Sequence, residues 1–310
     1  MTVFMFPGQG AQKPGMGADL LEVAEVAHSF SVASDVCGID VAALAKTGSA
    51  EEINDAYNAQ VLAVALSVGI SRALGARGIH PEAALGFSLG QISALIATEA
   101  LSEEDGFSLL GVRARSMAEA CNERPGAMYA LLGATHEDAQ GICNKCAEGD
   151  VLVCANYNAP GQVVVSGDVA AINRAEEAWR SAGKRGSRLN TAGAFHSPLM
   201  ASAAEAVRAK CAELSWSKPC VPVICNTDAQ PFAVEHAAER LASQVVSPVR
   251  FEQSVQALVA QGTTQFAEVG FGAVLNGLVR RIDKASGRVR VGTLEEFNAF
   301  VAAQADAGKE

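Results

Sequence analysis

A serine with glycine two residues to either side is the first candidate for chemistry in this sequence. Gly86-Phe87-Ser88-Leu89-Gly90 fits the pattern G-x-S-x-G, and it stands between an expected strand at 82–85 and an expected helix at 91–97. In this context a tight turn exposes the serine hydroxyl, and the helix N-terminus favours the negative charge of an oxyanion. The pattern predicts that Ser88 is a nucleophile; the alternative is a serine in an ordinary turn.

A serine nucleophile needs a general base. The chain has five histidines: His28, His80, His136, His196 and His236. His196 differs from the others because it lies in a turn, Gly193-Ala194-Phe195-His196-Ser197-Pro198, where strand–helix alternation resumes. We expect this histidine to face the active site; a histidine that caps the following helix is the alternative.

Two further features suit acyl transfer at a serine. Phe6-Pro7-Gly8-Gln9-Gly10-Ala11-Gln12 follows the first expected strand, and Lys13 stands where a dinucleotide fingerprint has its third glycine. The glycines instead allow a backbone N–H to approach a reacting carbonyl. Arg113 lies at the edge of an apolar helical stripe, where its guanidinium can bind a carboxylate in a cleft. A structural ion pair with an Asp or Glu is the alternative for Arg113.

The elements that position these residues alternate between strands and helices before residue 124 and after residue 192. Strands are expected at 3–6, 82–85, 221–226 and 265–269. Helices are expected at 18–30, 51–76, 91–97, 102–121, 198–214, 237–245, 250–260 and 273–282, with a short helix and frayed polar residues in the tail after Thr293. This alternation predicts an α/β fold with a parallel sheet and helices on both of its faces.

The segment 124–192 follows a different order. Strands are expected at 127–132, 151–155, 162–166 and 187–191, helices at 136–146 and 169–182, and a turn-rich stretch at 156–161. The order βαββαβ is that of a ferredoxin-like subdomain. We therefore expect one large catalytic domain formed by 1–123 and 193–310, interrupted by an inserted subdomain at 124–192.

Composition argues against several classes of function. The net charge of −10 argues against nucleic acid as a partner. The longest apolar run, 61–70, is too short to span a membrane and predicts a buried helix. No export signal opens the chain, so we expect a cytoplasmic protein with free thiols. Cys143-Asn144-Lys145-Cys146 has C-x-x-C spacing but no second ligand pair at zinc spacing, so no metal site is expected.

Together these motifs resemble those of the malonyl-CoA:acyl carrier protein transacylases and the related acyltransferase domains of polyketide and fatty acid synthases. Further segments that carry the resemblance are 156–164, Ser247-Pro248-Val249 and Glu268-Val269-Gly270-Phe271-Gly272. The resemblance covers nearly the whole chain. It implies a hydrolase-like α/β domain with a ferredoxin-like insert, malonyl-CoA as substrate, acyl carrier protein as partner and no bound cofactor.

The resemblance also implies a role for each site residue. Ser88 is the nucleophile, His196 its general base and Arg113 the clamp on the malonyl carboxylate. The remaining roles are an oxyanion hole from the backbone amides of Gln9 and Leu89, a cleft lined by Gln60, and a backbone carbonyl near Arg250 that orients His196.

Four positions bear on specificity and tuning. Phe195 is similar to the residue found in polyketide domains that load malonyl. Phe87, Gln91 and Ile92 depart from the family, which usually has His, Glu and Tyr there. Phe87 removes a second imidazole beside the nucleophile, so no such group can tune Ser88.

The implied reaction transfers malonyl from malonyl-CoA to the phosphopantetheine thiol of the carrier protein through a seryl ester. Fatty acid synthesis is the expected pathway, and a trans-acting polyketide acyltransferase is the alternative. A serine esterase would instead show an acidic triad member between the serine and the histidine. A non-catalytic homologue that binds the carrier protein would not need Ser88, His196 and Arg113 together. The densest basic groups, expected to meet the acidic carrier protein, are Lys184, Arg185 and Arg188, and Arg280, Arg281 and Lys284.

Overall fold

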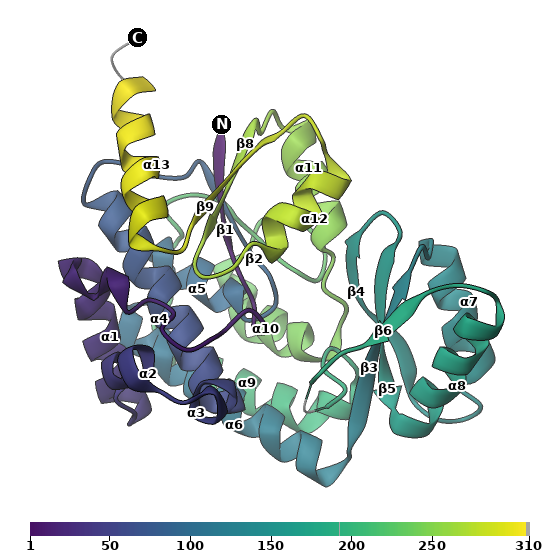
Figure 1. The fold of residues 1–310 in the computed structure, drawn as a ribbon. Helices are drawn as coiled ribbons and strands as arrows, with labels where there is room; N and C mark the ends of the chain where they lie inside the picture. Colours follow the sequence, from purple (N-terminus) through teal and green to yellow (C-terminus); the bar gives the residue numbers. More distant parts are fainter. Residues whose placement is uncertain (192, 308–310) are drawn as a thin grey trace. The chain divides into compact units, whose positions relative to one another are not determined.

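The computed structural model describes residues 1–191 and 193–307, and the chain divides into two compact units. The first unit comprises Met1–Gly111, Leu214–Cys225 and the chain from Leu258 onward. The second unit comprises Val112–Glu213 and Asn226–Ala257. Figure 1 traces both from the N-terminus in purple to the C-terminal helix in yellow.

The first unit is built on a parallel sheet of five strands in the order β7-β2-β1-β8-β9. The strands are β1 (Thr2–Phe6), β2 (Ala83–Gly86), β7 (Val223–Ile224), β8 (Gln265–Val269) and β9 (Gly287–Val291). Their side chains are buried on both faces in β1, β2 and β8, as the apolar runs predict. This sheet confirms the predicted α/β class.

Helices flank this sheet. They are η1 (Asp19–Glu22), α1 (Ala24–Cys37), α2 (Val41–Thr47), α3 (Ala50–Asn54), α4 (Ala56–Gly75), α5 (Gly90–Ala97), α12 (Val274–Ile282) and α13 (Leu294–Ala307). The connections from β1 to β2 and from β8 to β9 run toward opposite edges of the sheet. Since such crossovers are right-handed, α4 and α12 lie on opposite faces.

The helix α4 begins at a cap and is largely buried. The Asp55 carboxylate accepts hydrogen bonds from the backbone N–H groups of Tyr57 and Asn58, both at 3.0 Å. By length and composition α4 would be long enough to cross a membrane, but 78% of its most apolar window is buried inside the protein. It is thus a core helix, as the sequence predicts for 61–70.

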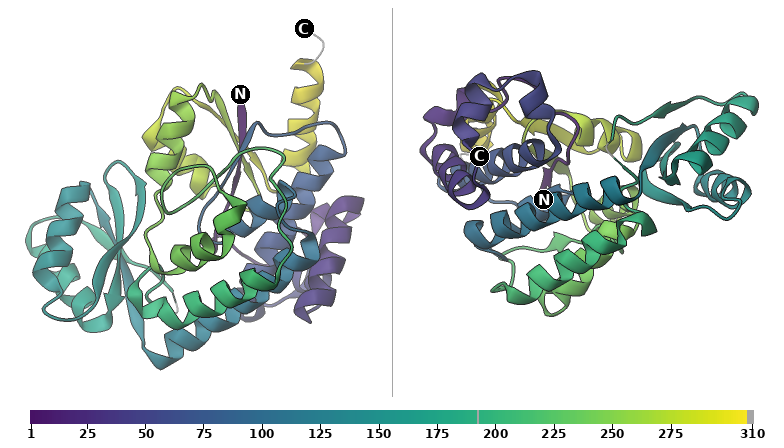
Figure 2. Two further views of the ribbon diagram at one scale, coloured as in Figure 1. Left: turned by 180° about the vertical axis from the view of Figure 1, so that it is seen from behind. Right: turned by 90° about the horizontal axis from the view of Figure 1, so that it is seen from below.

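The second unit contains an antiparallel sheet of four strands in the order β4-β5-β3-β6. Its elements are β3 (Gly126–Leu132), α7 (His136–Cys146), β4 (Leu152–Ala159), β5 (Gln162–Asp168), α8 (Val169–Ser181) and β6 (Gly186–Arg188). This βαββαβ order with two helices on one face is the predicted ferredoxin-like arrangement (Figure 2).

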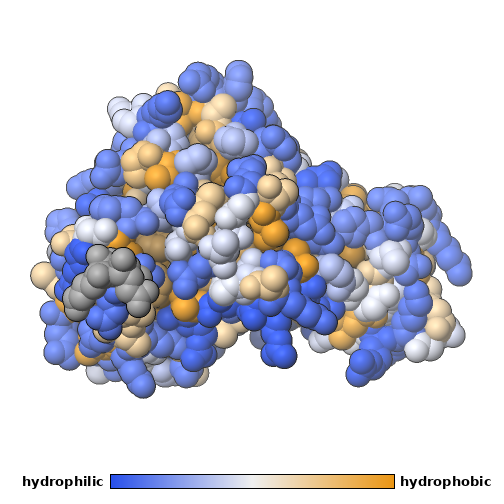
Figure 3. Space-filling view, turned by 90° about the horizontal axis from the view of Figure 1, so that it is seen from above, coloured by the Kyte–Doolittle hydropathy of each residue, from blue (hydrophilic) through white to orange (hydrophobic). Residues whose placement is uncertain are grey.

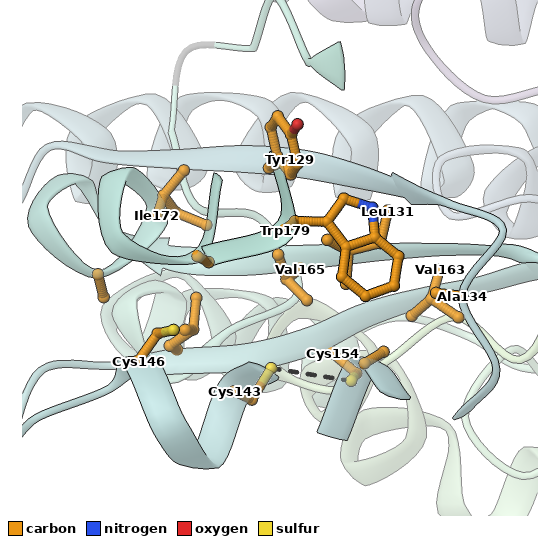
Figure 4. Close-up of a cluster of buried hydrophobic side chains, with 14 residues drawn as sticks. Tyr129, Leu131, Ala134, Cys143, Cys146, Cys154, Val163, Val165, Ile172 and Trp179 are labelled. Carbon is orange, nitrogen blue, oxygen red and sulfur yellow. Dashed lines mark hydrogen bonds between the residues drawn. The ribbon is translucent and has the colours of Figure 1, made fainter. Parts of the chain in front are cut away.

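Two apolar clusters cover the two faces of this sheet. The first lies under α7 and α8, and Figure 4 shows Trp179 and Ile172 packed over Val165. Cys143 and Cys146 belong to this core, and Cys143 Sγ lies 3.9 Å from Cys154 Sγ. The C-x-x-C spacing therefore marks the buried face of a helix. Among the residues that the structure describes, no group of three His, Cys, Asp or Glu side chains could hold a metal.

The remaining helices connect these sheets along the chain. They are α6 (Glu103–Glu123), η2 (Pro198–Met200), α9 (Ala201–Glu213), η3 (Val234–His236), α10 (Ala237–Val246) and α11 (Phe251–Ala260). Within the second unit α9 packs against α10. The stripe expected on α6 is buried, whereas Arg115 is exposed.

Several predicted boundaries are wrong. The tail forms a long helix, α13, because Phe297 and Phe300 are buried; residues 308–310 lie outside the described part of the chain. The helix α2 and the strand β9 were not predicted: α2 is seven residues long, and the valines of β9 alternate with Arg288 and Arg290. The segment 156–161 is mostly strand, since β4 continues to Ala159.

The surface carries mostly polar side chains. On the face shown in Figure 3, hydrophilic residues predominate and hydrophobic ones gather in small groups. Salt bridges are numerous at the surface of the second unit, where Arg124 meets Asp168 at 2.7 Å and Arg174 meets Asp150 at 2.7 Å. Such exposed pairs contribute at most about 1 kcal/mol each, so the clusters of buried apolar side chains supply most of the stability.

Candidate active site

Ser88 occupies a sharp turn between β2 and α5. Its backbone has a φ of 51°, in the left-handed region that residues other than glycine rarely adopt. The flanking residues must be glycines because there is no room for a side chain at either position. A Cβ at Gly86 would overlap the backbone nitrogen of Gln91, and a Cβ at Gly90 would overlap the carbonyl oxygen of Phe6. The side chain of Ser88 is thus turned out of the strand by the five-residue segment itself.

The loop after β1 lies beside this turn. The strands β1 and β2 are parallel neighbours, so both loops leave the carboxyl edge of the sheet. Phe87 N–H donates to the Phe6 carbonyl at 2.9 Å, and a Cβ at Gly8 would lie only 2.8 Å from the Phe87 carbonyl. Gln9, the next residue, is exposed, while Leu89 is buried at the start of α5. The two expected oxyanion-hole amides therefore belong to adjacent loops.

The other expected residues of this region lie on α4 and α5. Gln60 is a buried polar residue of α4, and Gln91 is fully buried, with its side-chain amide donating to Cys225 Sγ at 3.7 Å. Ile92 is also buried. Gln91 and Ile92 thus serve the core of the first unit.

His196 belongs to the second unit and also has a left-handed backbone, with a φ of 58°. The turn is fixed by the next residue, because Ser197 Oγ donates to the Ala194 carbonyl at 2.6 Å and accepts from Leu199 N–H at 3.2 Å. His196 itself is buried, with 4% of its surface exposed. Ser197, the residue after the histidine, therefore stabilises the turn by these two hydrogen bonds.

Two backbone carbonyls orient the imidazole. His196 Nδ1 lies 2.9 Å from the Gln244 carbonyl oxygen and 3.2 Å from the Ser247 carbonyl oxygen. A carbonyl only accepts hydrogen bonds, so Nδ1 carries the proton and donates it. Nε2 then bears the lone pair that a general base uses.

A backbone carbonyl near Arg250 was expected to orient His196, and the Ser247 carbonyl lies three residues before Arg250, whereas the carbonyl of Arg250 itself does not bind the imidazole. The Arg250 carbonyl accepts hydrogen bonds from Ser254, from its N–H at 3.0 Å and its Oγ at 2.9 Å, because α11 begins at Phe251. Ser247 and Gln244 stand instead at the end of α10, where the last carbonyls of a helix have no partner within it. The signal available in the sequence was Ser247-Pro248, since a proline ends the helix there.

The charge state of the imidazole follows from its surroundings. Burial and, to a smaller extent, the positive charge of Arg113 lower the pKa of His196, the two carbonyl hydrogen bonds partly oppose both effects, and the resulting pKa is about 4. The imidazole is therefore neutral at pH 7, in the form in which it can accept a proton.

Arg113 lies in the second unit with His196, on the buried side of α6. Only 4% of its surface is exposed, and burial lowers its pKa to about 10, so it is still a cation at pH 7. Ala114 and Met117, the neighbouring residues of the stripe, are also buried. A buried guanidinium of this kind is a strong site for a planar anion such as a carboxylate.

Phe195 completes the second group of residues. It packs on the face of the sheet opposite α7 and α8, against the cluster formed by Met128, Ala130, Ala155 and Val164. The structure thus brings the expected residues together in two groups. Ser88, Leu89, Gln9 and Gln60 lie in the first unit, and His196, Arg113 and Phe195 in the second.

Comparisons with known proteins agree on one family. Residues 3–295 match the family of acyl transferase domains. The chain is 38% identical to the malonyl CoA-acyl carrier protein transacylase of Bacillus subtilis, covering 91% of this chain and 90% of that one. It is 37% identical to the transacylase of the same name from Haemophilus influenzae, over 95% and 96% of the two chains.

Solved structures give the same likeness. A chain from the complex of a type II polyketide synthase acyl-carrier protein with its malonyl-transacylase superposes with a TM-score of 0.94 at 33% identity, covering 97% of this chain and 99% of that one. The malonyl-CoA:acyl carrier protein transacylase from Xanthomonas oryzae superposes with a TM-score of 0.93 at 37% identity, over 97% and 98%.

Proposed function

Because this chain belongs to the acyl transferase family of the malonyl CoA-acyl carrier protein transacylases, we propose that it transfers malonyl from malonyl-CoA to the phosphopantetheine thiol of an acyl carrier protein. The observation that carries the proposal is the buried guanidinium of Arg113, whose positive charge helps to lower the pKa of the His196 imidazole. A buried cation whose charge acts on the general base suits an acyl group that ends in a carboxylate.

Ser88 is the nucleophile in this proposal. Nε2 of His196 takes the hydroxyl proton while Oγ attacks the thioester carbon of malonyl-CoA. The oxyanion of the tetrahedral intermediate is stabilised by the backbone N–H groups of Gln9 and Leu89 and by the N-terminus of α5. The C–S bond then breaks, His196 returns the proton to the sulfur of CoA, and malonyl remains as an ester of Ser88.

The second half of the reaction reverses the first. His196 removes the proton of the phosphopantetheine thiol, the sulfur attacks the ester carbon, and the serine leaves with a proton from the imidazole. Throughout, the Gln244 and Ser247 carbonyls stabilise the imidazolium through Nδ1, where a triad enzyme would use a carboxylate. These residues complete the cycle with no bound cofactor.

Three residues set the acyl group. Arg113 binds the malonyl carboxylate with two hydrogen bonds, Gln60 lines the cleft, and Phe195 limits the space at the malonyl C2 position. Acetyl-CoA lacks the carboxylate and leaves Arg113 without its anion, so malonyl-CoA is preferred.

The acceptor is a carrier protein of fatty acid synthesis, and we expect the reaction to take place in the cytoplasm. A polyketide carrier protein is a second candidate, favoured by the likeness to the transacylase bound to such a protein. The segment 124–192 is the inserted subdomain, and 1–123 with 193–310 form the catalytic domain. Two groups of basic residues, at 184–188 and at 280–284, are the candidates for docking the acidic carrier protein.

Incubation with malonyl-CoA and intact-mass measurement tests the proposal. One malonyl group should appear on the protein within one turnover and should leave when the pantetheinylated carrier protein is added. An esterase would instead lose the acyl group to water at the same rate with and without the carrier protein. A protein that never gains the malonyl mass would refute the proposed function.

A further inference from the structure

The strand β4 is irregular where it passes Ala155. Its register with β5 shifts between Cys154 and Asn156, which makes Ala155 the extra residue of a β-bulge. A bulge turns the backbone groups of the extra residue away from the ladder. The Ala155 carbonyl accepts a hydrogen bond from Val249 N–H at 2.9 Å, and Tyr157 N–H donates to the Val249 carbonyl at 2.9 Å. The strand therefore binds both the N–H and the C=O group of Val249.

Val249 ends the short segment that orients His196. Two residues earlier, the Ser247 carbonyl accepts a hydrogen bond from His196 Nδ1. Ser247 is extended, and Pro248 has a fixed φ and restricts the residue before it, so the segment is stiff. Two extended residues span roughly 7 Å. A displacement of β4 is thus passed to the carbonyl that holds the imidazole.

A second contact joins the same sheet to the same histidine. Phe195, which precedes His196, packs against the apolar cluster formed by Met128, Ala130, Ala155 and Val164. Ala155 therefore accepts the hydrogen bond from Val249 and also belongs to the cluster that supports Phe195. Both contacts lie within the second unit.

We propose that the four-stranded sheet positions His196, with the bulge at Ala155 holding the Ser247–Val249 segment and Val164 supporting Phe195. This inference rests on the proposed role of His196 as general base. The sheet of this subdomain then fixes the direction in which Nε2 points. Ala155 and Val164 are positioning residues for the transfer.

Two adjacent valines of β5 provide a matched test. Val164 belongs to the cluster against which Phe195 packs, whereas Val165 points into the cluster under α7 and α8, beside Trp179 (Figure 4). Both are buried, and Val164→Ala and Val165→Ala remove the same atoms. Both variants should lose similar stability. Only Val164→Ala should lower kcat, by about ten- to a hundredfold, because small misplacements of a catalytic group cost that much.

The direct measurement is the proton NMR signal of His196 Nδ1–H, recorded without substrate. It should move in Val164→Ala and stay in place in Val165→Ala. Equal changes in both variants, or none in Val164→Ala, would overturn the positioning role. A moved signal with unchanged kcat would support the positioning and refute the base role of His196.

A second variant keeps the test open if Val164→Ala does not fold. Replacing Val249 by the corresponding α-hydroxy acid turns its amide into an ester and removes the N–H that donates to Ala155, with the side chain unchanged. The same shift of the His196 signal and the same loss of kcat are expected. An ester variant with the wild-type signal would mean that the bulge does not hold this segment.

Discussion

The two groups of candidate residues are built in different ways, although each contains a residue in the left-handed backbone region. Ser88, with a φ of 51°, is held by its own neighbours, because a strand, two glycines and a helix within a few residues force the turn. At His196, with a φ of 58°, Ser197 fixes the turn, but the imidazole is held by carbonyls 48 and 51 residues further along the chain. Strain of this kind persists only where the surroundings over-determine it.

This difference separates local from long-range control of the site. The position of the serine depends on a pentapeptide, whereas that of the imidazole depends on α10, β4 and the packing of Phe195. Substitutions far from the chemistry in sequence should therefore disturb the histidine more readily than the serine.

The largest effect is expected from Ser88→Ala. Removal of Oγ eliminates the covalent step, so transfer should fall on the order of 10⁴-fold or more. Intact mass after incubation with malonyl-CoA should show no added malonyl. Ser93→Ala, which changes the next serine along α5, is the control and should be labelled like the wild type. Malonyl labelling of the Ser88→Ala variant would show that another residue is the nucleophile.

This contrast also explains how far the sequence could predict the site. The Ser88 turn, the stripe around Arg113 and the βαββαβ order are encoded in short patterns with a fixed period, and the structure has them as expected. The Gln244 and Ser247 carbonyls carry no side-chain signal, since any residue supplies a carbonyl. The bulge at Ala155 was hidden for the same reason: its effect comes from the backbone register of two strands.

Gly90→Ala should disrupt the turn that positions Ser88 without removing an atom that takes part in the reaction. Its Cβ would overlap the Phe6 carbonyl, which belongs to a central strand and cannot move aside. We expect a loss of at least about 3 kcal/mol in the free energy of unfolding. Gly277→Ala on α12 is the control, because a Cβ there meets nothing within 4 Å and should stabilise the helix by about 0.5–1 kcal/mol. Similar melting temperatures for the two variants would contradict the steric argument.

Arg113→Ala should change the acyl preference more than the chemical step. Truncation of one member of a buried charge pair costs about 2–5 kcal/mol, which corresponds to roughly 30- to 3,000-fold in kcat/KM for malonyl-CoA. Acetyl-CoA has no carboxylate that depends on Arg113, so kcat/KM for acetyl-CoA should stay the same or rise. The ratio of the two kcat/KM values, compared with the wild type, is the measurement. A parallel fall for both substrates in a folded variant would assign Arg113 a structural role.

The buried imidazole should make the stability of the second unit depend on pH. The pKa of His196 falls from its ordinary 6.5 to about 4 on folding, so the unfolded chain binds more protons between these values. The free energy of unfolding should therefore drop as the pH falls from 6.5 to 4, by about 3 kcal/mol from this residue. His196→Asn lacks the titrating group, and urea unfolding at pH 7 and pH 4 should show a smaller drop. Equal drops would mean that His196 is not desolvated in solution.

The smallest effect concerns which unit meets the carrier protein. Lys184 and Arg188 of the second unit already face acids, Asp138 at 3.1 Å and Glu176 at 3.0 Å, which reduces the positive field they offer.

The basic residues at the end of α12 in the first unit include the exposed Arg280 and Lys284. Charge reversal of these two should raise KM for the carrier protein about fivefold, which is about 1 kcal/mol, and should flatten its dependence on salt. Arg185→Glu should change KM less than twofold, because the acids that pair with Lys184 and Arg188 already reduce the positive potential around Arg185. Neither variant should alter the rate of malonyl loading from malonyl-CoA, because rim charges act on encounter and not on the bound thioester. A larger effect from Arg185→Glu would place the docking surface on the unit that holds His196, and the carrier protein would then contact the same subdomain that positions the base.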